Sequence, residues 1–327
     1  LWSGTTYAFH SLLWGYGWYS SSKPQAVRTY AMIPATSPYR VPDIISACVL
    51  DSKRPGHLYS SRRFGRGGHW SKQRDYTVVF DEGNSNLRRD TYVTPDYAMG
   101  TFTVDMNKDY IALIDQNRVM GVMFASSATE RIMVFAKAGK APEKSFAGIS
   151  GVTRENCMVV QRDKNVSQDG KATQIFVSKE AWENRKESGG WLFTQLDDAY
   201  CALRPAKGGY KTQIIEAGVE LTIDDLWAPV IIQMGQAGDY KSFDAFQSSV
   251  EENVLRYSSG AMTYTSEAGE TFTVYPNSKT TPKVNGKTVD LNPKNTFASP
   301  YLNMVHGEET ATFSYGEFPD LIMNFKH

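Results

Sequence analysis

The sequence has no excess of charge of either sign and no long hydrophobic run. Lysine and arginine together number 35, as do aspartate and glutamate, so the formal net charge at pH 7 is zero. A neutral chain creates no long-range field that favours nucleic acid or an anionic membrane. The longest apolar stretches, such as Pro229 to Met234, fall far short of the roughly 20 residues that cross a bilayer. We therefore expect a soluble protein that binds neither nucleic acid nor a membrane.

Cysteine is scarce, and histidine lacks the spacing of a metal site. The three cysteines, Cys48, Cys157 and Cys201, cannot all pair with one another, and none belongs to a CxxC motif. Buried free thiols are the simpler interpretation. No two of the five histidines have the HxxxH or HExxH spacing that places two imidazoles on one helical face. The sequence therefore predicts no local zinc site.

No motif for a cation, a nucleotide or a serine nucleophile is complete. Asp105 to Asp109 begins like a calcium loop, but Tyr110 replaces the glycine and Gln116 the bidentate glutamate. The oxygen-rich stretch from Asp81 to Asp90 could hold a hard cation irregularly, and a solvated loop is the simpler interpretation. There is no GxSxG elbow and no phosphate-binding glycine fingerprint. We predict neither a metal nor a cofactor.

What the chain does have is many short β-rich runs separated by turn residues. We predict strands at Tyr76–Phe80, Gly100–Met106, Val119–Ala125, Arg131–Lys137, Cys157–Gln161, Thr173–Ser178, Trp191–Gln195, Tyr200–Leu203, Lys211–Glu216, Val230–Met234, Met262–Ser266, Thr271–Tyr275, Thr288–Leu291, Thr310–Tyr315 and Leu321–Phe325. Almost no helices intervene, so the pattern favours a mainly β fold built as a large antiparallel β-sandwich. Asn285-Gly286 between two of these regions is a strong hairpin signal, because both turn positions need positive φ.

Helical spacing is confined to three places. Apolar residues recur at helical intervals from Tyr7 to Trp18 and from Asp43 to Leu50, and again from Ser242 to Leu255 after the expected cap Ser242. The stretch from Ser52 to Lys72 is rich in serine, glycine and arginine, which is typical of a surface loop. We place the domain junction there, which divides the chain into a helical segment, 1–65, and an antiparallel sandwich domain, 66–327.

Basic and aromatic residues gather around this junction. The cluster comprises Arg62, Arg63, Arg66, His69, Trp70, Arg74, Arg88, Arg89, Tyr92, Asp96 and Tyr97. A guanidinium pairs with a carboxylate through two hydrogen bonds, and a flat ring covers the apolar face of a sugar, so the cluster suits a sugar acid. The same composition would equally hold a domain junction together by stacking arginine on tyrosine.

Three segments, Tyr92–Thr101, Ser242–Gln247 and Pro300–Leu302, resemble a heparinase II/III-like group of microbial proteins. The resemblance implies an (α/α) toroid followed by a large antiparallel β-supersandwich. The opening helical segment, with Gly4, His10 and Trp14, would then correspond to the end of the toroid. A missing N-terminal helical domain or chain would be a partner, and the protein would be secreted or periplasmic.

The resemblance also implies a polysaccharide lyase that cleaves a uronic-acid polymer by β-elimination. Such a reaction needs a group that neutralises the carboxylate, a base for the neighbouring proton and an acid for the leaving oxygen. By residue type, Arg66 or Arg89 would neutralise, His69 would act as base and Tyr92 or Tyr97 as acid. An acidic polysaccharide or oligosaccharide would be the bound partner, and its predicted contacts are Arg62, Arg63, Trp70, Arg89 and Asp96.

Two other functions fit the same residues. One is a non-catalytic glycan-binding or structural β-sandwich module, in which the aromatics bind or simply pack. The other is a toroid-type glycoside hydrolase, for which Asp90 and Asp96 are the loop carboxylates on offer. A tyrosine acting in the lyase would need its pKa of about 10 lowered by neighbouring arginines. The one glycosylation sequon, Asn165-Val166-Ser167, is predicted to lie in an exposed loop.

Overall fold

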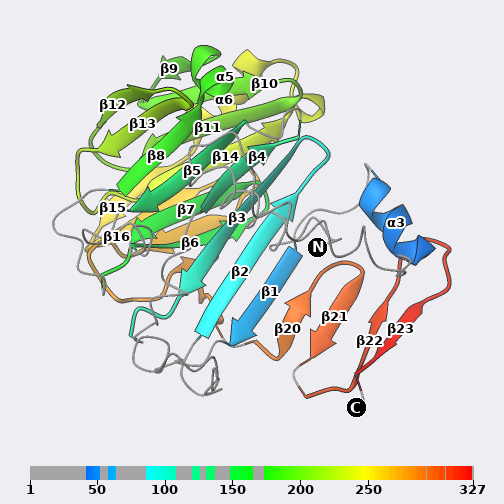
Figure 1. The fold of residues 1–327 in the computed structure, drawn as a ribbon. Helices are drawn as coiled ribbons and strands as arrows, with labels where there is room; N and C mark the ends of the chain where they lie inside the picture. Colours follow the sequence, from blue (N-terminus) through cyan, green and yellow to red (C-terminus); the bar gives the residue numbers. More distant parts are fainter. Residues whose placement is uncertain are drawn as a thin grey trace.

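The structure, a computed structural model, describes residues 42–51, 58–63, 86–107, 120–125, 130–136, 148–164, 173–291, 293–305 and 307–325. Within these ranges the chain forms three antiparallel sheets of twelve, six and five strands, which confirms the mainly β fold (Figure 1). The predicted helix at Tyr7–Trp18, the predicted strand at Tyr76–Phe80 and the sequon at Asn165 lie outside the described residues. No helix in the described part is long and apolar enough to cross a membrane.

The twelve-stranded sheet runs across the whole molecule. In spatial order its strands are β12 (Tyr210–Ile215), β13 (Gly218–Ile223), β8 (Thr173–Ser178), β5 (Arg131–Ala136), β4 (Met120–Phe124), β3 (Tyr97–Val104), β2 (Asn86–Val93), β1 (Leu58–Arg63), β20 (Asn295–Ala298), β21 (Leu302–Val305), β22 (Thr310–Phe313) and β23 (Leu321–Asn324). Seven of the twelve were predicted from their short β-rich runs, with ends that differ by at most three residues, and the other five, β13, β2, β1, β20 and β21, were missed.

The other two sheets are smaller and lie beside helices. The six-stranded sheet has the order β6 (Ile149–Arg154), β7 (Cys157–Arg162), β14 (Val230–Gln236), β11 (Ala199–Pro205), β10 (Trp191–Leu196) and β9 (Lys186–Ser188). The five-stranded sheet runs β15 (Leu255–Ser258), β16 (Ala261–Thr265), β17 (Thr271–Val274), β18 (Lys283–Val284) and β19 (Lys287–Thr288). The helices are α3 (Asp43–Leu50), α5 (Lys179–Glu183), α6 (Phe243–Glu252) and the short 3₁₀ turn η2 (Ala237–Asp239).

The six-stranded sheet is the middle layer of the core. Successive side chains of a strand point to opposite faces, and β14 is buried on both. Ile232 and Met234 pack with residues of the twelve-stranded sheet, whereas Ile231 packs with α6 and the five-stranded sheet. A strand covered on both faces is apolar at consecutive positions instead of alternating ones. This explains why the consecutive residues Val230, Ile231 and Ile232 of β14 are all apolar.

Helix α6 covers the middle sheet and begins where the sequence predicts. The Ser242 hydroxyl accepts a hydrogen bond from the Ala245 backbone N–H at 3.1 Å, which is the geometry of an N-cap. Phe246 and Val250 are buried against the sheet. The helix ends at Glu252, so the predicted extension to Leu255 is wrong, and Leu255 begins β15 instead.

The junction region contains a strand that the sequence analysis missed. Within Ser52–Lys72, predicted to be a loop, Leu58–Arg63 forms β1 and pairs with β2 and β20. The loop prediction is therefore wrong for these residues, and the sheet begins before residue 66. Through β1 the sheet continues into β20–β23, which project to one side (Figure 1).

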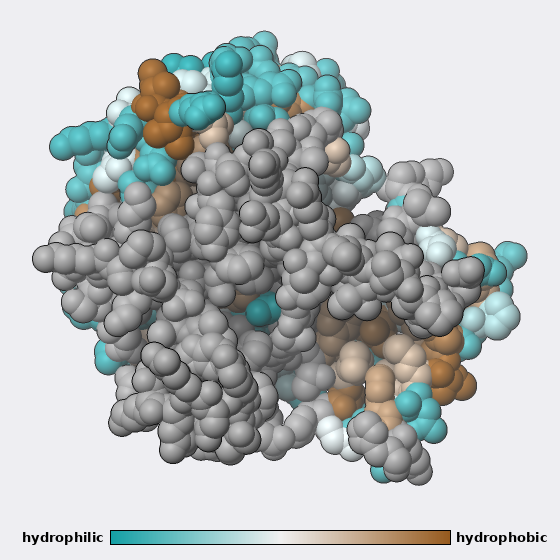
Figure 2. Space-filling view, in the orientation of Figure 1, coloured by the Kyte–Doolittle hydropathy of each residue, from teal (hydrophilic) through white to brown (hydrophobic). Residues whose placement is uncertain are grey.

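Helix α3, which the sequence predicted, packs against the projecting strands. Its Ile44 and Cys48 form a small core with Phe313 of β22. Apolar side chains, including Leu321 and Met323, gather on this face of the projecting strands (Figure 2). The four strands are thus held to the molecule by β1 at one side and by α3 over one face.

Two further predictions are confirmed. Asn285 and Gly286 have φ of 51° and 75°, as a type I′ hairpin requires, and they join β18 to β19. All three cysteines are free and buried. The strand predicted at Thr288–Leu291 is mostly wrong, because only Thr288 belongs to a strand.

Candidate functional site

The β2–β3 hairpin carries the predicted site residues that the structure describes best. Arg89 stacks over Phe102, its neighbour on β3, with the guanidinium carbon 4.9 Å from the ring centroid. Tyr92 lies three positions further along β2 and therefore points to the opposite face of the sheet. There it meets Tyr97, with ring centroids 6.2 Å apart. The hairpin thus brings the two predicted tyrosines together and separates them from Arg89.

A tight turn fixes Tyr97 and Asp96. The Thr94 hydroxyl accepts hydrogen bonds from the backbone N–H groups of Asp96 and Tyr97, at 3.2 and 3.0 Å. The Asp96 carboxylate accepts a hydrogen bond of 2.6 Å from the side-chain amide of Gln236. Because Gln236 ends β14, this bond ties the turn to the middle sheet. Asp96 therefore has a structural partner that the sequence did not suggest.

The surroundings of the two tyrosines are acidic. Burial raises the pKa of Tyr97 well above 10, and the neighbouring Tyr92 adds to the rise. Burial also raises the pKa of Tyr92, as do the carboxylates of Glu155 and Asp239. The lowering by arginine that we expected is therefore wrong in direction. Tyr97 is only 2% exposed and belongs to the sandwich core, while Tyr92 is half-buried and is the more accessible of the pair.

The remaining predicted residues divide into two groups. Arg66, His69 and Trp70 lie outside the described residues, so their assigned roles stay predictions. Arg62 and Arg63 lie at the end of β1, opposite Leu87 and Asn86 in the register.

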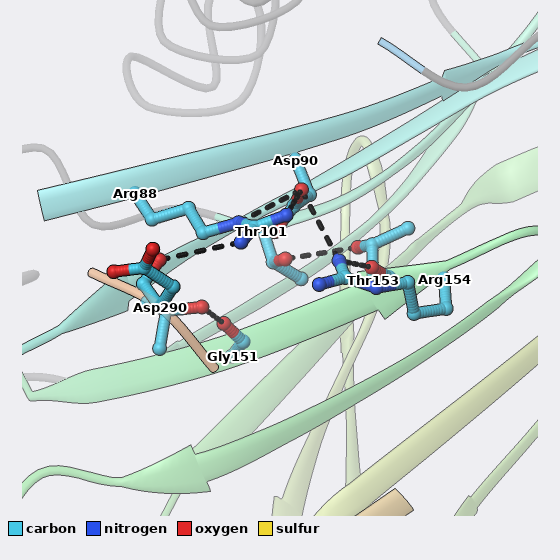
Figure 3. Close-up of polar contacts among 8 residues, drawn as sticks. Arg88, Asp90, Thr101, Gly151, Thr153, Arg154 and Asp290 are labelled. Carbon is cyan, nitrogen blue, oxygen red and sulfur yellow. Dashed lines mark hydrogen bonds and ion pairs between the residues drawn. The ribbon is translucent and has the colours of Figure 1, made fainter. Parts of the chain in front are cut away.

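Asp90 is a buried structural carboxylate and not a loop residue. It lies within β2, its side chain is 0% exposed, and it forms ion pairs with Arg88 at 2.9 Å and with Arg154 at 3.2 Å (Figure 3). The solvated loop predicted for Asp81–Asp90 is therefore wrong at its end. A carboxylate held between two arginines inside the sandwich cannot reach a polymer. A glycoside hydrolase that uses Asp90 and Asp96 as its two carboxylates is therefore not supported.

Asp90 belongs to a polar seam between the two large sheets, where β3 crosses β6 (Figure 3). The Thr101 and Thr153 hydroxyls are 2.9 Å apart, and the Thr103 hydroxyl donates to the Gly151 carbonyl at 2.7 Å. A Cβ at Gly151 would lie 2.7 Å from the sulfur of Met120 and 3.0 Å from the methyl group of Thr101, so a larger residue there would have to displace these side chains. The seam also explains why the sequence analysis missed β6. Its serine, glycine and threonine residues are typical of a loop, but here they lie against β3 inside the sandwich.

A second group of residues, which we call the Trp227 platform, was not anticipated. It consists of Trp227, Arg162 and Lys164. The guanidinium carbon of Arg162 lies 5.2 Å from the centroid of the Trp227 ring, and the Lys164 ammonium lies 5.0 Å from it. Trp227 is half-buried, Arg162 is buried and Lys164 is exposed. Burial lowers the pKa of Arg162 to about 10, so the guanidinium remains charged at neutral pH.

Hydrogen bonds fix the loop that carries Trp227. The Asp225 carboxylate accepts from the Trp227 backbone N–H at 3.0 Å and pairs with Lys207 at 2.9 Å. Two hydrogen bonds lower the pKa of Asp225. The bond from Lys207 has the larger effect, and the bond from the Trp227 backbone has the next largest. Lys164 on the other side is hydrogen-bonded to Asn277 of the five-stranded region. The platform thus rests on three separate segments, and a sequence offers no signal for such a meeting.

No family model, no curated protein and no solved structure matches the chain. The resemblance to the heparinase II/III-like group therefore stays a prediction. No group of three or more histidine, cysteine, aspartate or glutamate residues is placed to bind a metal ion within the described ranges.

Proposed function

We propose that the chain binds an acidic polysaccharide or oligosaccharide and that one sugar-acid residue docks on the Trp227 platform. A half-exposed indole offers a flat apolar surface with a polar edge, which suits the apolar face of a pyranose. Lys164 and Arg162 place two positive charges within 5.2 Å of the ring centre. A sugar carboxylate beside the ring would meet the exposed Lys164 ammonium and would lie in the field of the buried Arg162 charge, whereas a neutral sugar would gain from the stacking alone.

The observation that carries the proposal is the pair of cations around one accessible ring. The nearest carboxylate of the same loop, Asp225, is already bonded to Lys207 and to the loop backbone. It is therefore held in place and does not swing across to neutralise Lys164. Because Lys164 is exposed, we expect the interaction with an anionic glycan to weaken as salt is raised.

β-Elimination of the bound uronate is a second candidate, supported by Tyr92. The Tyr92 hydroxyl is protonated at neutral pH, as a general acid for the leaving oxygen must be, but the rise of its pKa is opposite to the lowering that the lyase was expected to require. In this proposal His69 removes the proton and Arg66 neutralises the carboxylate. Tyr92 is placed ahead of Tyr97 because Tyr97 is buried in the core.

A matched pair of variants tests glycan binding. Lys164 and Lys186 are both exposed lysines that lie over an aromatic ring, Lys186 at 5.4 Å from Phe243. Binding of polygalacturonate and of its neutral methyl ester is measured by calorimetry. We expect Lys164→Gln to weaken binding of the acidic polymer about 3- to 10-fold, which is roughly 0.6–1.4 kcal/mol. Lys186→Gln should leave it unchanged. Equal binding of both polymers, or equal effects of both variants, would refute the proposal.

A separate assay tests the chemistry. The protein is incubated with a panel of uronate polymers, and unsaturated products are followed by their ultraviolet absorbance. Tyr92→Phe keeps the ring and removes only the proton donor, so turnover should fall while binding stays nearly intact. If no polymer yields unsaturated products, the lyase proposal fails and the binding proposal stands or falls on the Lys164 result.

A further inference from the structure

Four oxygen atoms near the β6–β7 turn are buried without hydrogen-bond partners among the residues that the structure describes. They are Oδ1 of Asn156, Oε1 of Gln233, Oγ of Ser266 and Oε1 of Glu267. Gln233 is 0% exposed and Ser266 is 3% exposed. A buried polar atom with no partner costs roughly 1–3 kcal/mol, so four such atoms together require an explanation.

The two amide groups cannot be reinterpreted by exchanging nitrogen and oxygen. The Gln233 amide nitrogen donates to the carbonyls of Asn156 and Met234, each at 3.3 Å. The Asn156 amide nitrogen donates to the same Met234 carbonyl at 2.8 Å. Turning either amide would bring its oxygen against a carbonyl oxygen, so the assignment is fixed by the network. Both free atoms are therefore acceptors.

Contacts place Asn156 and Gln233 side by side. Their amides share the Met234 carbonyl, and Gln233 lies opposite Cys157 in the register. Tyr264 of β16 packs in the same core cluster as Cys157, so the turn that follows β16 with Ser266 and Glu267 covers this face of the strand pair.

Tyr240 anchors Glu267 over the same end of β14. Its hydroxyl donates to the second carboxylate oxygen of Glu267. Its ring lies against Gly235, where an added Cβ would be 2.7 Å from the ring. Ser266 is the residue before Glu267 and follows the end of β16. The four oxygens thus come from three segments, the β6–β7 turn, β14 and the β16–β17 turn.

The chemistry of this set favours a cation over water. Three of the four oxygens can only accept, and one water molecule has two hydrogens to donate. One of them also belongs to a carboxylate, and a buried charge is costly unless a charge of the opposite sign accompanies it. Amide, hydroxyl and carboxylate oxygens are the ligands that hard cations prefer. The set contains neither a thiolate nor an imidazole, so a soft metal does not fit.

We propose that Asn156, Gln233, Ser266 and Glu267 form a binding site for one hard cation, calcium or sodium. The cation would join the five-stranded sheet to the middle sheet, because Glu267 and Ser266 come from one and Gln233 from the other. It would also stabilise the end of β14, whose Gln236 holds the turn of Asp96 and Tyr97. The site is distinct from the Trp227 platform and lies at the other end of the β7–β14 pair.

Thermal unfolding of the full chain tests the site. Chelator-treated protein is titrated with calcium or sodium, and choline serves as a cation that carries charge without coordinating. We expect the unfolding temperature to rise and saturate with calcium, sodium or both, and to rise less with choline at equal ionic strength. A further readout is terbium luminescence excited through tyrosine, because Tyr240 contacts Glu267. Bound terbium should be displaced by the cation that stabilises the protein.

Three variants separate a cation site from a structural cluster. Glu267→Gln keeps the shape and removes the charge, so the cation response and the terbium signal should fall at least 10-fold. Ser266→Ala removes one of the four oxygens without adding a charge and should weaken the cation response. Glu270→Gln is the control, since Glu270 lies in the same turn but accepts from Asn285 instead. If Glu267→Gln fails to fold, the Ser266→Ala result decides. An unchanged response in Glu267→Gln, an unchanged response in Ser266→Ala, or equal stabilisation by choline would overturn the proposal.

Discussion

Replacing Asp90 by asparagine should remove the charge at the centre of the polar seam without changing its shape. The Asp90 side chain is 0% exposed, and Arg88 and Arg154 pair with it at 2.9 and 3.2 Å. Removing one partner of a fully buried ion pair costs about 3–5 kcal/mol, because the other charge stays buried and unpaired. Here the arginine side chains keep 12% and 19% exposure, so part of that penalty is relieved by water. We expect a loss of about 2–4 kcal/mol.

Equilibrium unfolding in urea, followed by tryptophan fluorescence, measures the effect. The midpoint should fall while the dependence on urea stays the same, because the variant leaves the exposed area of both states nearly unchanged. Glu183→Gln is the control. Glu183 pairs with Lys179 at 3.9 Å with both side chains more than 60% exposed, and such a pair contributes about 0.5 kcal/mol or less. If Asp90→Asn costs no more than Glu183→Gln, the seam does not stabilise the sandwich as argued.

Three further predictions concern a helix cap, an acid-sensitive loop and the thiols. Ser242→Ala should lower the free energy of unfolding by about 1 kcal/mol in urea titration, because it removes an N-cap; Ser248→Ala, within the same exposed helix, should cost nothing. The lowered pKa of Asp225 means that its contribution to stability is complete above its ordinary value of 3.8 and is lost as the pH falls through the lowered pKa. Asp225→Asn should therefore reduce the acid-side slope of stability against pH, and an unchanged slope would contradict this role. Cys157 and Cys201 are 0% exposed and burial raises the pKa of both thiols, so neither should react with a thiol reagent until the protein unfolds. Labelling of either in the folded protein would show that the core opens.

Sequence reasoning found many of the strands, although it missed the apolar β13, and it also missed β2, whose charged side chains bond to one another. Thr173–Ser178 was predicted to the residue, because apolar and β-branched residues fill it. β2 was missed because Arg88, Arg89 and Asp90 look like solvated residues when they are read singly. In the structure the charges of Arg88 and Asp90 satisfy each other, so the strand enters the core. A pair of this kind has no periodic signature.

The candidate site was harder to predict for a related reason. Its residues were grouped by closeness in sequence, which holds in a loop but fails in a strand, where side chains alternate between faces. Arg89 and Tyr92 are three positions apart and lie on opposite faces once 86–93 is known to be β2. The expected lowering of the tyrosine pKa by arginine was therefore wrong, because it assumed that these residues lie together in a loop.

The sites that the structure does assemble depend on contacts between distant segments. Arg162 and Trp227 are joined by the pairing of β7 with β14, which places the end of one strand beside the start of the other. The same pairing places Gln233 opposite Cys157 at the other end of the two strands. One strand pair therefore positions both the cationic platform and the buried oxygens, which lie at its opposite ends. If the cation proposed there tightens this pairing, its removal should also loosen the platform, and the affinity for polygalacturonate should then fall in chelator-treated protein. An affinity that does not depend on the cation would show that the two sites act separately.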